Sequence, residues 1–449
     1  MKTAKYSAYK PSGIEWLGDV PEHWRIDRLK ASIVSCRNGI WGDEAQGDEN
    51  DIPCVRVADF DRQKLRVELD EPTIRSVTGK ERSGRLLSKG DLLLEKSGGG
   101  ENQPVGCVVL YDDARPAVCS NFVARVVVAN DQHSSYWRYV HAAAYAVRLT
   151  VGSINQTSGI QNLDQARYFN EYVAFPPPTE QAAIAAFLDR ETAKIDALVE
   201  EQKRLIELLK EKRQAVISQA VTKGLDPSVP MKDSGVAWLG EVPAHWEVYR
   251  NKVLFKEIDD RSDDGVGDLM TVSHLTGVTR RSEKNVNMIL AETLDGYKRG
   301  GSGDLVINTM WAWMGALGVS PCDGLFSPSY NVYRIRNPSR LLPSYYDYLC
   351  RVQQHVTEMR SRSTGIWESR LRLYPDVFLD MRVCVPPPAE QAAIVSTIVR
   401  RLGALDALNT AAEQGIQLLQ ERRSALISAA VTGKIDVRGL VPQPEVTAA

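Results

Sequence analysis

The sequence lacks the short motifs by which many enzymes and metal proteins are recognised. It has no GxxxxGK[ST] phosphate-binding loop, no HxxxH pair, no GxSxG nucleophile motif and no Asn/Asp-Pro-Pro-aromatic tetrad of the kind that amino-methyltransferases use. Carboxylates in a convincing metal-nuclease spacing are also missing, and the glycine run at 98–100 fits a flexible turn. We therefore predict a chain without catalytic, cofactor-binding or metal-binding residues of its own.

Cysteines are few and show no pairing pattern. The seven cysteines are scattered, odd in number and never spaced as CxxC. This favours reduced thiols in a cytosol over disulfides or a zinc site. No apolar run approaches the length of a membrane span, and residues 1–10 are polar, without the apolar core of a signal peptide. These features predict a cytoplasmic protein with no membrane anchor.

A general excess of positive charge is also missing. The 449 residues include 55 Lys and Arg against 57 Asp and Glu, a formal net charge of -2 at pH 7. Any binding of nucleic acid must therefore come from local patches. A chain of this length suggests about three domains and can bury several cores.

A long helical segment occurs twice. Residues 176–222 begin with PPPTEQAAI and residues 386–432 begin with PPPAEQAAI, 210 positions later and without a gap. Prolines block helix formation before each segment, and a glycine follows each one as a stop signal. Thr179 can cap the first helix, whereas Ala389 occupies the equivalent position in the second. At about 1.5 Å per residue, each helix would be roughly 60 to 65 Å long.

Both helical segments carry an apolar stripe with alternating steps of four and three residues. In each stripe seven of ten positions are apolar, and polar residues interrupt both stripes at matching positions. The large apolar residues predicted to form a coiled-coil or partner interface are Ile184, Leu188, Ile195, Leu198, Leu205, Leu209, Val216, Ile394, Ile398, Leu405, Leu408, Leu419 and Leu426. We expect the helices to pair as an antiparallel coiled coil. The simpler alternative is that each helix packs on its own domain, with the charged stretch 200–213 as a solvated face.

A second repeat opens each half of the chain. Residues 12–24, SGIEWLGDVPEHW, return as residues 234–246, SGVAWLGEVPAHW, at an offset of 222. His23 and His245 lie beside tryptophans in turn-like segments, so structural packing explains them better than catalysis. Because the offset falls to 210 at the helices, the intervening segment is 12 residues shorter in the second half.

The two intervening segments, about 29–175 and 253–385, present short β-like runs, turns and a helix-like stretch in the same order. The predicted fold class is α/β, with two mixed α/β domains separated and joined by two long antiparallel coiled-coil helices in an internal pseudo-twofold repeat. The predicted boundaries are a first domain at 1–178, a central helix at 179–223, a second domain at 224–388, a distal helix at 389–433 and a tail at 434–449.

Side chains that can read base edges or stack on bases gather in the predicted loops of both domains. In the first domain the candidates are Arg37, Asn38, Lys96, Ser97, Asn102, Gln103, Asn121, Asn155, Gln156, Thr157 and Ser158. In the second domain they are Arg280, Arg281, Asn308, Trp311, Trp313, Tyr330, Asn331, Arg360, Arg362, Ser363, Thr364 and Trp367. A polar loop residue is usually only solvated, and a tryptophan more often belongs to a core. The recurrence at equivalent places supports the loops more than any single residue.

The paired motifs at 12–24 with 234–246 and at 176–184 with 386–394 resemble those of the specificity subunit of type I restriction-modification systems, over essentially the whole chain. The resemblance implies two target recognition domains, each reading one part of a bipartite sequence of double-stranded DNA. Since the domains differ, the target should be asymmetric. The helices would set the spacer and dock two methyltransferase subunits. S-adenosylmethionine, ATP and Mg²⁺ would belong to these partners and to the restriction (translocase) subunits, which makes this chain a non-catalytic recognition subunit.

Two other classes of function fit parts of this pattern. A structural coiled-coil adaptor would bind protein through its variable domains and show no DNA sequence preference. A self-sufficient nuclease or methyltransferase with an unrecognised site would turn over without partners. A neighbouring gene for an adenine methyltransferase would favour the specificity subunit over both.

Overall fold

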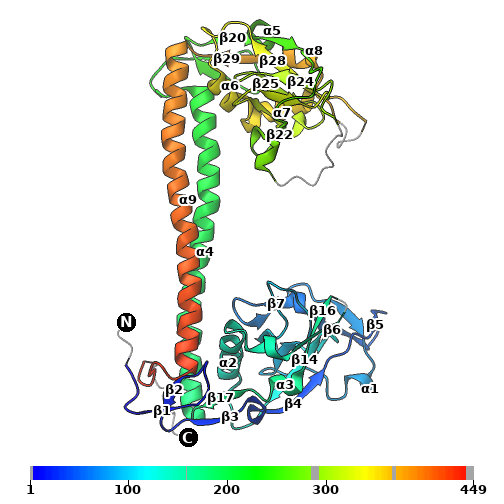
Figure 1. Cartoon of the computed structure of the whole chain (residues 1–449), viewed down its shortest axis with the longest axis vertical. Helices are drawn as coiled ribbons and strands as arrows, with labels where there is room; N and C mark the ends of the chain where they lie inside the picture. Colours follow the sequence, from blue (N-terminus) through cyan, green and yellow to red (C-terminus); the bar gives the residue numbers. More distant parts are fainter. Residues whose placement is uncertain (1–3, 158, 285–292, 367–370, 441–449) are drawn as a thin grey trace. The chain divides into compact units, whose positions relative to one another are not determined.

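The structure is a computed structural model that describes residues 4–157, 159–284, 293–366 and 371–440 (Figure 1). The chain divides into two compact units. Unit 1 comprises Met1–Lys203 and Glu413–Ala449, and unit 2 comprises Arg204–Ala412. Two long helices, α4 (Pro178–Lys223) and α9 (Pro388–Val431), each contribute one part to unit 1 and the other part to unit 2. Both predicted long helices are therefore present.

Unit 1 is built on a six-stranded sheet with an apolar central strand. The strand order is β4 (Ile33–Asn38), β14 (Val123–Val128), β10 (Leu92–Glu95), β12 (Val108–Leu110), β8 (Arg66–Val67) and β7 (Phe60–Asp61). Leu92 and Leu94 of β10 join one core cluster, and Leu93 joins a second cluster on the opposite face. Because both faces of the sheet are covered, β10 is an apolar run without alternation.

Smaller elements complete unit 1. Its other strands are β1 (Tyr9–Pro11), β2 (Asp19–Pro21), β3 (Arg25–Arg28), β5 (Asp43–Glu44), β6 (Asp51–Val55), β9 (Ile74–Ser76), β11 (Ser97–Gly98), β13 (Val118–Cys119), β15 (Ile154–Thr157), β16 (Ile160–Leu163) and β17 (Tyr172–Phe175). Its short helices are α1 (Gly79–Arg82), α2 (Ser134–Ala146) and α3 (Gln165–Tyr168), with 3-10 turns at Leu29–Ser32, Val57–Asp59 and Leu149–Ser153.

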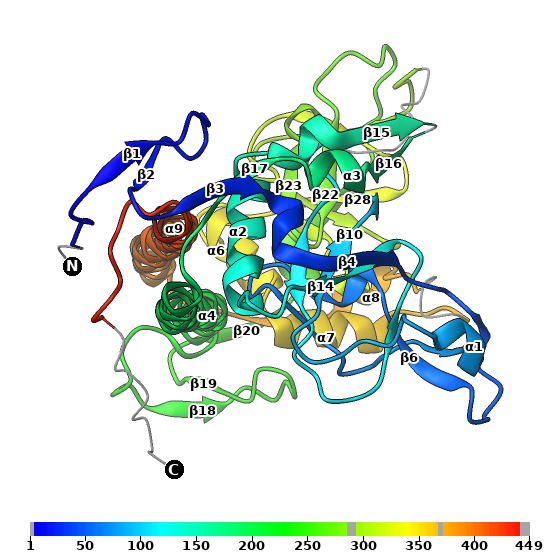
Figure 2. The same ribbon diagram turned by 90° about the horizontal axis from the view of Figure 1, so that it is seen from below.

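Helix α2 joins the sheet of unit 1 to the long helices, and it lies between them in both views (Figures 1 and 2). Tyr136 and Trp137 of α2 are fully buried. They belong to one apolar cluster that also contains Leu188 of α4 and Ile427 of α9. The sheet domain and the helix segments of unit 1 therefore share one core.

Unit 2 repeats the central part of this design with different side chains. Its four-stranded sheet has the order β21 (Phe255–Ile258), β28 (Tyr330–Ile335), β25 (Leu305–Asn308) and β26 (Leu317–Val319). Strand β25 again pairs antiparallel with both neighbours. One core cluster of unit 2 contains Leu305, Ile307, Tyr345, Val221 of α4 and Ile398 of α9. Mixed α/β structure is thus confirmed for both units.

The remaining elements of unit 2 are short. The other strands are β18 (Met231–Asp233), β19 (Glu241–Pro243), β20 (Glu247–Arg250), β22 (Met270–Ser273), β23 (Gly277–Arg280), β24 (Lys298–Gly300), β27 (Gly324–Phe326) and β29 (Arg382–Val385). The other helices are α5 (Asn251–Leu254), α6 (Pro343–Cys350), α7 (Gln353–Arg362) and α8 (Pro375–Asp380), with 3-10 turns at Arg281–Glu283 and Ala312–Met314.

The buried stripe of the long helices differs in phase from the predicted ladder. The predicted residues that are buried are Ile184, Leu188, Ile195, Val216, Ile394 and Ile398, and those that are half-buried are Leu209, Leu405, Leu419 and Leu426. Leu198, Leu205 and Leu408, however, are exposed rather than lying in the seam. Two consecutive four-residue steps lead from Ile184 through Leu188 to Thr192. Every second later position therefore moves by one residue, whereas Ile195 and Val216 stay in the buried stripe.

At every second position of the predicted ladder, the next residue along the helix turns inward instead. In α4 these residues are Thr192, Val199, Ile206 and Arg213, and in α9 they are Leu402, Asn409, Ile416 and Arg423. All of them are buried or half-buried, and each α9 residue is the counterpart of an α4 residue 210 positions earlier. The shift in phase is therefore the same in both helices.

The ends of the long helices follow local backbone rules. Gly224 and Gly433 adopt positive φ values of 79° and 72°, the left-handed conformation with which many helices end. Helix α4 begins at Pro178, so Thr179 lies inside the first turn instead of capping it. Among the described residues, no helix is both long enough and apolar enough to cross a membrane.

Candidate nucleic-acid interface

A glutamate at the start of each long helix holds the opening motif of its unit. In unit 1 the Glu180 carboxylate accepts hydrogen bonds from Trp24 Nε1 at 3.2 Å and from the Tyr6 hydroxyl, and His23 Nε2 lies 2.9 Å from its second oxygen. Burial and the nearby carboxylate raise the pKa of the Tyr6 hydroxyl well above its usual range, so Tyr6 is the donor. These contacts explain His23 as a structural residue.

The same arrangement occurs in unit 2. Trp246 Nε1 donates to Glu390 at 3.1 Å, and His245 Nε2 lies 2.7 Å from the other carboxylate oxygen. Glu390 is the residue 210 positions after Glu180, and the two motif residues lie 222 positions after their counterparts. The two repeats recognised in the sequence are therefore in direct contact within each unit.

The neighbouring glutamine of each PPPxEQ motif binds the loop before the domain helix. Gln181 Nε2 donates to Pro176 O at 3.0 Å, and Gln181 Oε1 accepts from the backbone N–H of His133 at 3.0 Å. Gln391 Nε2 donates to Pro386 O at 2.8 Å, and its Oε1 accepts from Leu342 N at 2.7 Å. Both glutamines are fully buried, so each domain is fastened to the first turn of one long helix.

The opposite end of a long helix completes each junction. In unit 1 the Lys434 ammonium group, just past α9, donates to the carbonyls of Leu17 and Asp19 at 2.9 and 2.8 Å. A side chain at Gly433 would collide with Pro21, because the ideal Cβ position lies 2.3 Å from Pro21 Cδ. In unit 2 Lys223 Nζ donates to Glu241 O at 2.5 Å. The junctions therefore fix each domain on its own helix pair.

Each domain also presents a cavity where the central strand of its sheet ends. The unit 1 cavity has a volume of about 450 Å³ and is lined by Trp41, Arg56, Val57, Ala58, Glu95, Ser97, Gly98, Gly99, Ser120, Asn121 and Phe122. The unit 2 cavity has a volume of about 490 Å³, and its lining includes His274, Arg281, Lys284, Asn308, Met310, Trp311 and Tyr330. Exposed aromatic surface together with polar groups is typical of sites that bind nucleic-acid bases.

The structure brings only some of the predicted residues of unit 1 into this cavity. Ser97 and Asn121 line it. Arg37 and Asn38 are exposed on β4, where Asn38 Oδ1 accepts from Gln165 Nε2 at 3.0 Å. Lys96 is half-buried, and the exposed remainder is Asn102, Gln103, Asn155 and Gln156. Ser158 and the side chain of Thr157 lie outside the described residues.

In unit 2 four predicted residues meet at the cavity, namely Arg281, Asn308, Trp311 and Tyr330. Two arginines are instead paired with acids: Arg280 with Asp268 at 3.0 Å, and Arg362 with Glu358 at 2.5 Å. Such pairing offsets part of the positive charge that a phosphate contact would use.

Five other predicted residues of unit 2 that the structure describes do not line the cavity. Asn331 is buried, and its amide donates to the Tyr333 hydroxyl at 3.4 Å, so this amide already has a partner inside the domain. The Trp313 ring lies under the Arg360 guanidinium at 5.7 Å. Ser363 Oγ donates to Met359 O at 2.7 Å. Thr364 is exposed, and Trp367 lies outside the described residues.

Several cavity residues were missed by the sequence analysis. Trp41 and Phe122 are both partly exposed and come from loops 81 residues apart, and the Arg75 guanidinium lies 4.6 Å from the Trp41 ring. Glu95 was missed because it directly follows the apolar residues of a predicted strand. The available signal was a large aromatic side chain in a glycine-rich or polar loop, as in Gly39-Ile40-Trp41.

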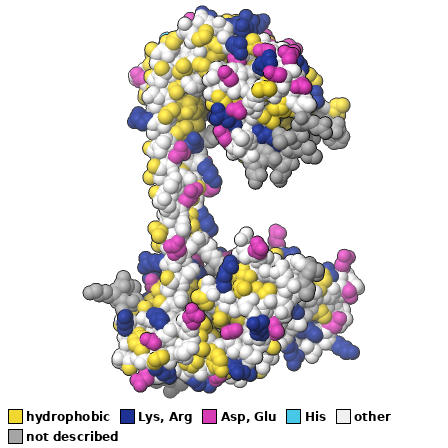
Figure 3. All heavy atoms as spheres, viewed as in Figure 1, with side chains coloured by type: hydrophobic (Ala, Val, Ile, Leu, Met, Phe, Trp, Pro, Cys, Tyr) yellow, Lys and Arg dark blue, Asp and Glu magenta, His cyan; other side chains and the backbone are white. Residues whose placement is uncertain are grey.

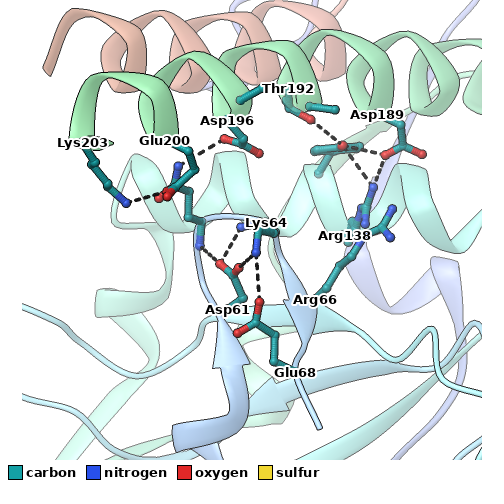
Figure 4. Close-up of a pocket in the computed structure, with 14 residues that line it drawn as sticks. Asp61, Lys64, Arg66, Glu68, Arg138, Asp189, Thr192, Asp196, Glu200 and Lys203 are labelled. Atoms are coloured by element: carbon teal, nitrogen blue, oxygen red, sulfur yellow. Dashed lines mark hydrogen bonds and ion pairs between the residues drawn. The ribbon is translucent and has the colours of Figure 1, made fainter. Parts of the chain in front are cut away.

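A third cavity lies in unit 1 between α4, α2 and the β7–β8 hairpin, with a volume of about 580 Å³ (Figure 4). Its side chains bind one another. Lys64 lies between Asp61 and Glu68 at 3.1 and 3.0 Å, and Arg138 donates to Asp189. These pairs make the cavity a polar junction between the domain and α4. Within the described part of the chain, no cluster of three or more His, Cys, Asp or Glu could hold a metal ion.

Charges of both signs are interleaved on the visible surface. In the space-filling view, Lys and Arg side chains alternate with Asp and Glu side chains over the face that is drawn (Figure 3). This agrees with a formal net charge of -2 for the whole chain. Neutralisation of many phosphates by this chain alone is therefore disfavoured on that face.

Comparisons with known proteins give a distant sequence relative. No protein-family model matches the chain. The putative type I restriction enzyme MjaX specificity subunit of Methanocaldococcus jannaschii is 21% identical over 254 residues, which cover 55% of this chain and 56% of that protein. The match thus spans little more than half the length of this relative.

Two solved structures are similar over nearly the whole chain. The HsdS subunit from Thermoanaerobacter tengcongensis has a TM-score of 0.56 at 13% identity, covering 93% of this chain and 98% of that chain. A structure of a type I R-M system, studied for its complex assembly and conformational transition, has a TM-score of 0.60 at 15% identity, covering 92% and 98%. At these identities the likeness shows the fold. Together these relatives confirm the predicted resemblance to type I specificity subunits.

Proposed function

We propose that this chain is the specificity subunit of a type I restriction-modification system, with target recognition domains at 1–178 and 224–388. Each domain reads one half of a bipartite, asymmetric DNA sequence. The observation that carries this proposal is that two cavities occupy the same place in two related domains but are lined by different side chains. Two unequal half-sites require two domains of the same fold whose base-contacting side chains differ.

The long helices act as the spacer between the half-sites in this proposal. Two ion pairs that repeat at an offset of 210 support it. In unit 1 Arg423 binds Asp196 at 3.0 Å, and in unit 2 Arg213 binds Asp406 at 2.5 Å. A buried polar pair between two helices, such as Arg423 with Asp196, fixes their register, because a shifted register would leave buried charges unpaired. A fixed register sets a fixed distance between two readers, as half-site spacing does in other duplex-binding proteins.

The helices also dock two copies of a methyltransferase subunit. The support comes from exposed leucines that repeat at the same offset. Leu198 and Leu408 are 52% and 54% exposed, and Leu208 and Leu418 are 51% and 64% exposed. Apolar side chains at equivalent exposed positions fit two equivalent partner surfaces.

The chemistry belongs to the partners. Methyltransferase subunits bind S-adenosylmethionine, and restriction subunits bind ATP and Mg²⁺ and translocate DNA, while this chain supplies recognition. Since the chain is nearly neutral, we expect weak DNA binding by the isolated subunit and strong binding by the complex.

The decisive experiment is to co-express the chain with the methyltransferase encoded beside its gene. Methylated adenines are then mapped across a plasmid by single-molecule sequencing. Methylation at one asymmetric bipartite motif is the expected result. A stable complex that methylates without regard to sequence, or not at all, would instead favour the coiled-coil adaptor.

A further inference from the structure

We propose that Glu95 and Asn308 are corresponding base-reading residues, one for each half-site, and that their different hydrogen-bonding groups make the two half-sites differ. This inference rests on the proposed function. Glu95 accepts a hydrogen bond from an exocyclic amino group, that of cytosine or adenine. Asn308 donates a hydrogen bond to a base acceptor.

Strand pairing puts the two residues at the same place in the fold. Glu95 is the last residue of β10 and lies opposite Val123, the first residue of β14. Asn308 is the last residue of β25 and lies opposite Tyr330, the first residue of β28. The order of the central strands is the same in both sheets. The correspondence therefore comes from register and does not depend on sequence alignment.

Both side chains also lie on the same sheet face. Leu93 lies two residues before Glu95, and Val306 lies two residues before Asn308. Because side chains two residues apart on a strand point to the same face of the sheet, Glu95 lies on the face of Leu93, and Asn308 lies on the face of Val306. Leu93 and Val306 belong to the smaller apolar clusters, away from the cores that contain the long helices. Glu95 and Asn308 line the unit 1 and unit 2 cavities, respectively. A ligand on this face would not displace α4 or α9.

Glu95, which lines the unit 1 cavity, has one buried acceptor atom without a hydrogen bond. Its side chain is almost fully buried, and Oε1 accepts from Arg62 Nη2 at 2.7 Å. Its second oxygen, Oε2, has no hydrogen-bond partner among the described residues. A buried carboxylate oxygen without a donor is unfavourable, and an amino group on a bound base would satisfy it. Arg62 also offsets the repulsion between this carboxylate and DNA phosphates.

Asn308 leaves the opposite group unpaired. Its Oδ1 accepts from the Met310 backbone N–H at 3.3 Å, whereas its Nδ2 has no hydrogen-bond partner in the described ranges. The free amide N–H groups can donate to a purine N7 or to a carbonyl oxygen of a base.

Aromatic side chains frame both polar groups. Trp41 and Phe122 stand beside Glu95, and Trp311 and Tyr330 stand beside Asn308. Phe122 is 45% exposed and Trp311 is 47% exposed, so stacking surface is available in each cavity. Apolar surface around a few polar groups is the usual composition of a site that selects by hydrogen bonding.

The test uses the complete complex with methyltransferase subunits, and it compares methylation motifs of the wild type, Glu95→Gln and Asn308→Asp. Glu95→Gln should lower methylation of the original motif at least about tenfold and change one position of one half-site. Asn308→Asp should change one position of the other half-site only. Spacer length should stay the same in both. Glu15→Gln makes the same chemical change at an exposed position of the opening motif and should leave the motif unchanged.

The outcomes separate this inference from the proposed function. A wild-type complex without sequence preference would defeat the proposed function. A specific wild-type complex whose Glu95→Gln variant assembles and methylates the same motif at an unchanged rate would overturn the role of Glu95. If Glu95→Gln does not assemble, Glu95→Asp retains the acceptor on a shorter side chain. It should keep the base preference with at least about tenfold weaker methylation, and an unchanged rate would again overturn the role.

Discussion

Arg423 of α9 donates a hydrogen bond to Asp196 of α4 at 3.0 Å, and both side chains are largely buried. The equivalent pair, Arg213 with Asp406, has a distance of 2.5 Å but is mostly exposed. The two pairs come from the same position of a repeated sequence. They therefore allow the effect of burial to be measured on one chemical interaction.

Removal of Asp196 should be much more damaging than removal of Asp406. Asp196→Ala leaves the Arg423 guanidinium buried without its partner, which should lower the free energy of unfolding by about 3 kcal/mol. Asp406→Ala removes an exposed pair and should cost about 0 to 1 kcal/mol. Urea unfolding followed by circular dichroism measures both values. Equal losses would show that burial does not strengthen the Arg423–Asp196 pair relative to the exposed Arg213–Asp406 pair.

The two buried histidines make the free energy of unfolding depend on pH. Burial lowers the pKa of His141 to about 3 and that of His355 to about 4, from an ordinary value of about 6.5. Below pH 6.5 the unfolded chain takes up protons that the folded chain does not, so the free energy of unfolding falls as pH falls. The loss continues to the folded pKa values, at up to about 1.4 kcal/mol per pH unit for each histidine.

This pH dependence can be assigned by substitution. His141→Gln should reduce the slope of the unfolding free energy between pH 6.5 and 4.5, because one of the histidines that contribute to it is removed. The exposed His274→Gln is the control and should leave the slope unchanged. A slope in His141→Gln equal to that of the wild type would show that this histidine is protonated in the folded state.

Substitution of Leu198 or Leu408, two exposed leucines at equivalent positions of the long helices, should prevent the binding of one methyltransferase subunit each. Leu198→Asp and Leu408→Asp each change one exposed side chain, so the fold should be stable within about 0.5 kcal/mol of the wild type. If the two surfaces are equivalent, each variant should bind one methyltransferase subunit instead of two, and the double variant none. Native mass spectrometry of the complexes counts the subunits. Two bound subunits in the double variant would exclude these leucines from the docking surface.

Shorter helices should shorten the DNA spacer. Deletion of seven residues within Glu191–Lys212, together with seven at the equivalent positions of α9, removes about 10 Å of helix. This corresponds to about three base pairs of DNA. Methylation mapping should then show a shorter spacer between unchanged half-sites. An unchanged spacer, or altered half-sites, would argue against the helices as a ruler.

Much of the architecture was predictable because its signals are local. A proline stop followed by an apolar period of three to four residues is sufficient to predict a long helix, and α4 and α9 occupy the two predicted segments. Paired motifs at constant offsets predicted a duplicated design, and the Glu180 and Glu390 junctions explain why these motifs occur together. The resemblance to type I specificity subunits rested on the same residues.

The tertiary structure decided the features that depend on distant segments. After Leu188 every second position of the buried stripe moves by one residue, and no local signal distinguishes Leu198 from Val199. Glu95 was not predicted as a site residue, because its position at the end of a strand does not show that one of its oxygens lacks a hydrogen-bond partner. Trp41 and Phe122 meet only after the sheet has formed. Periodicity and repeats are properties of the sequence itself, whereas a cavity and its chemistry arise from side chains brought together by folding.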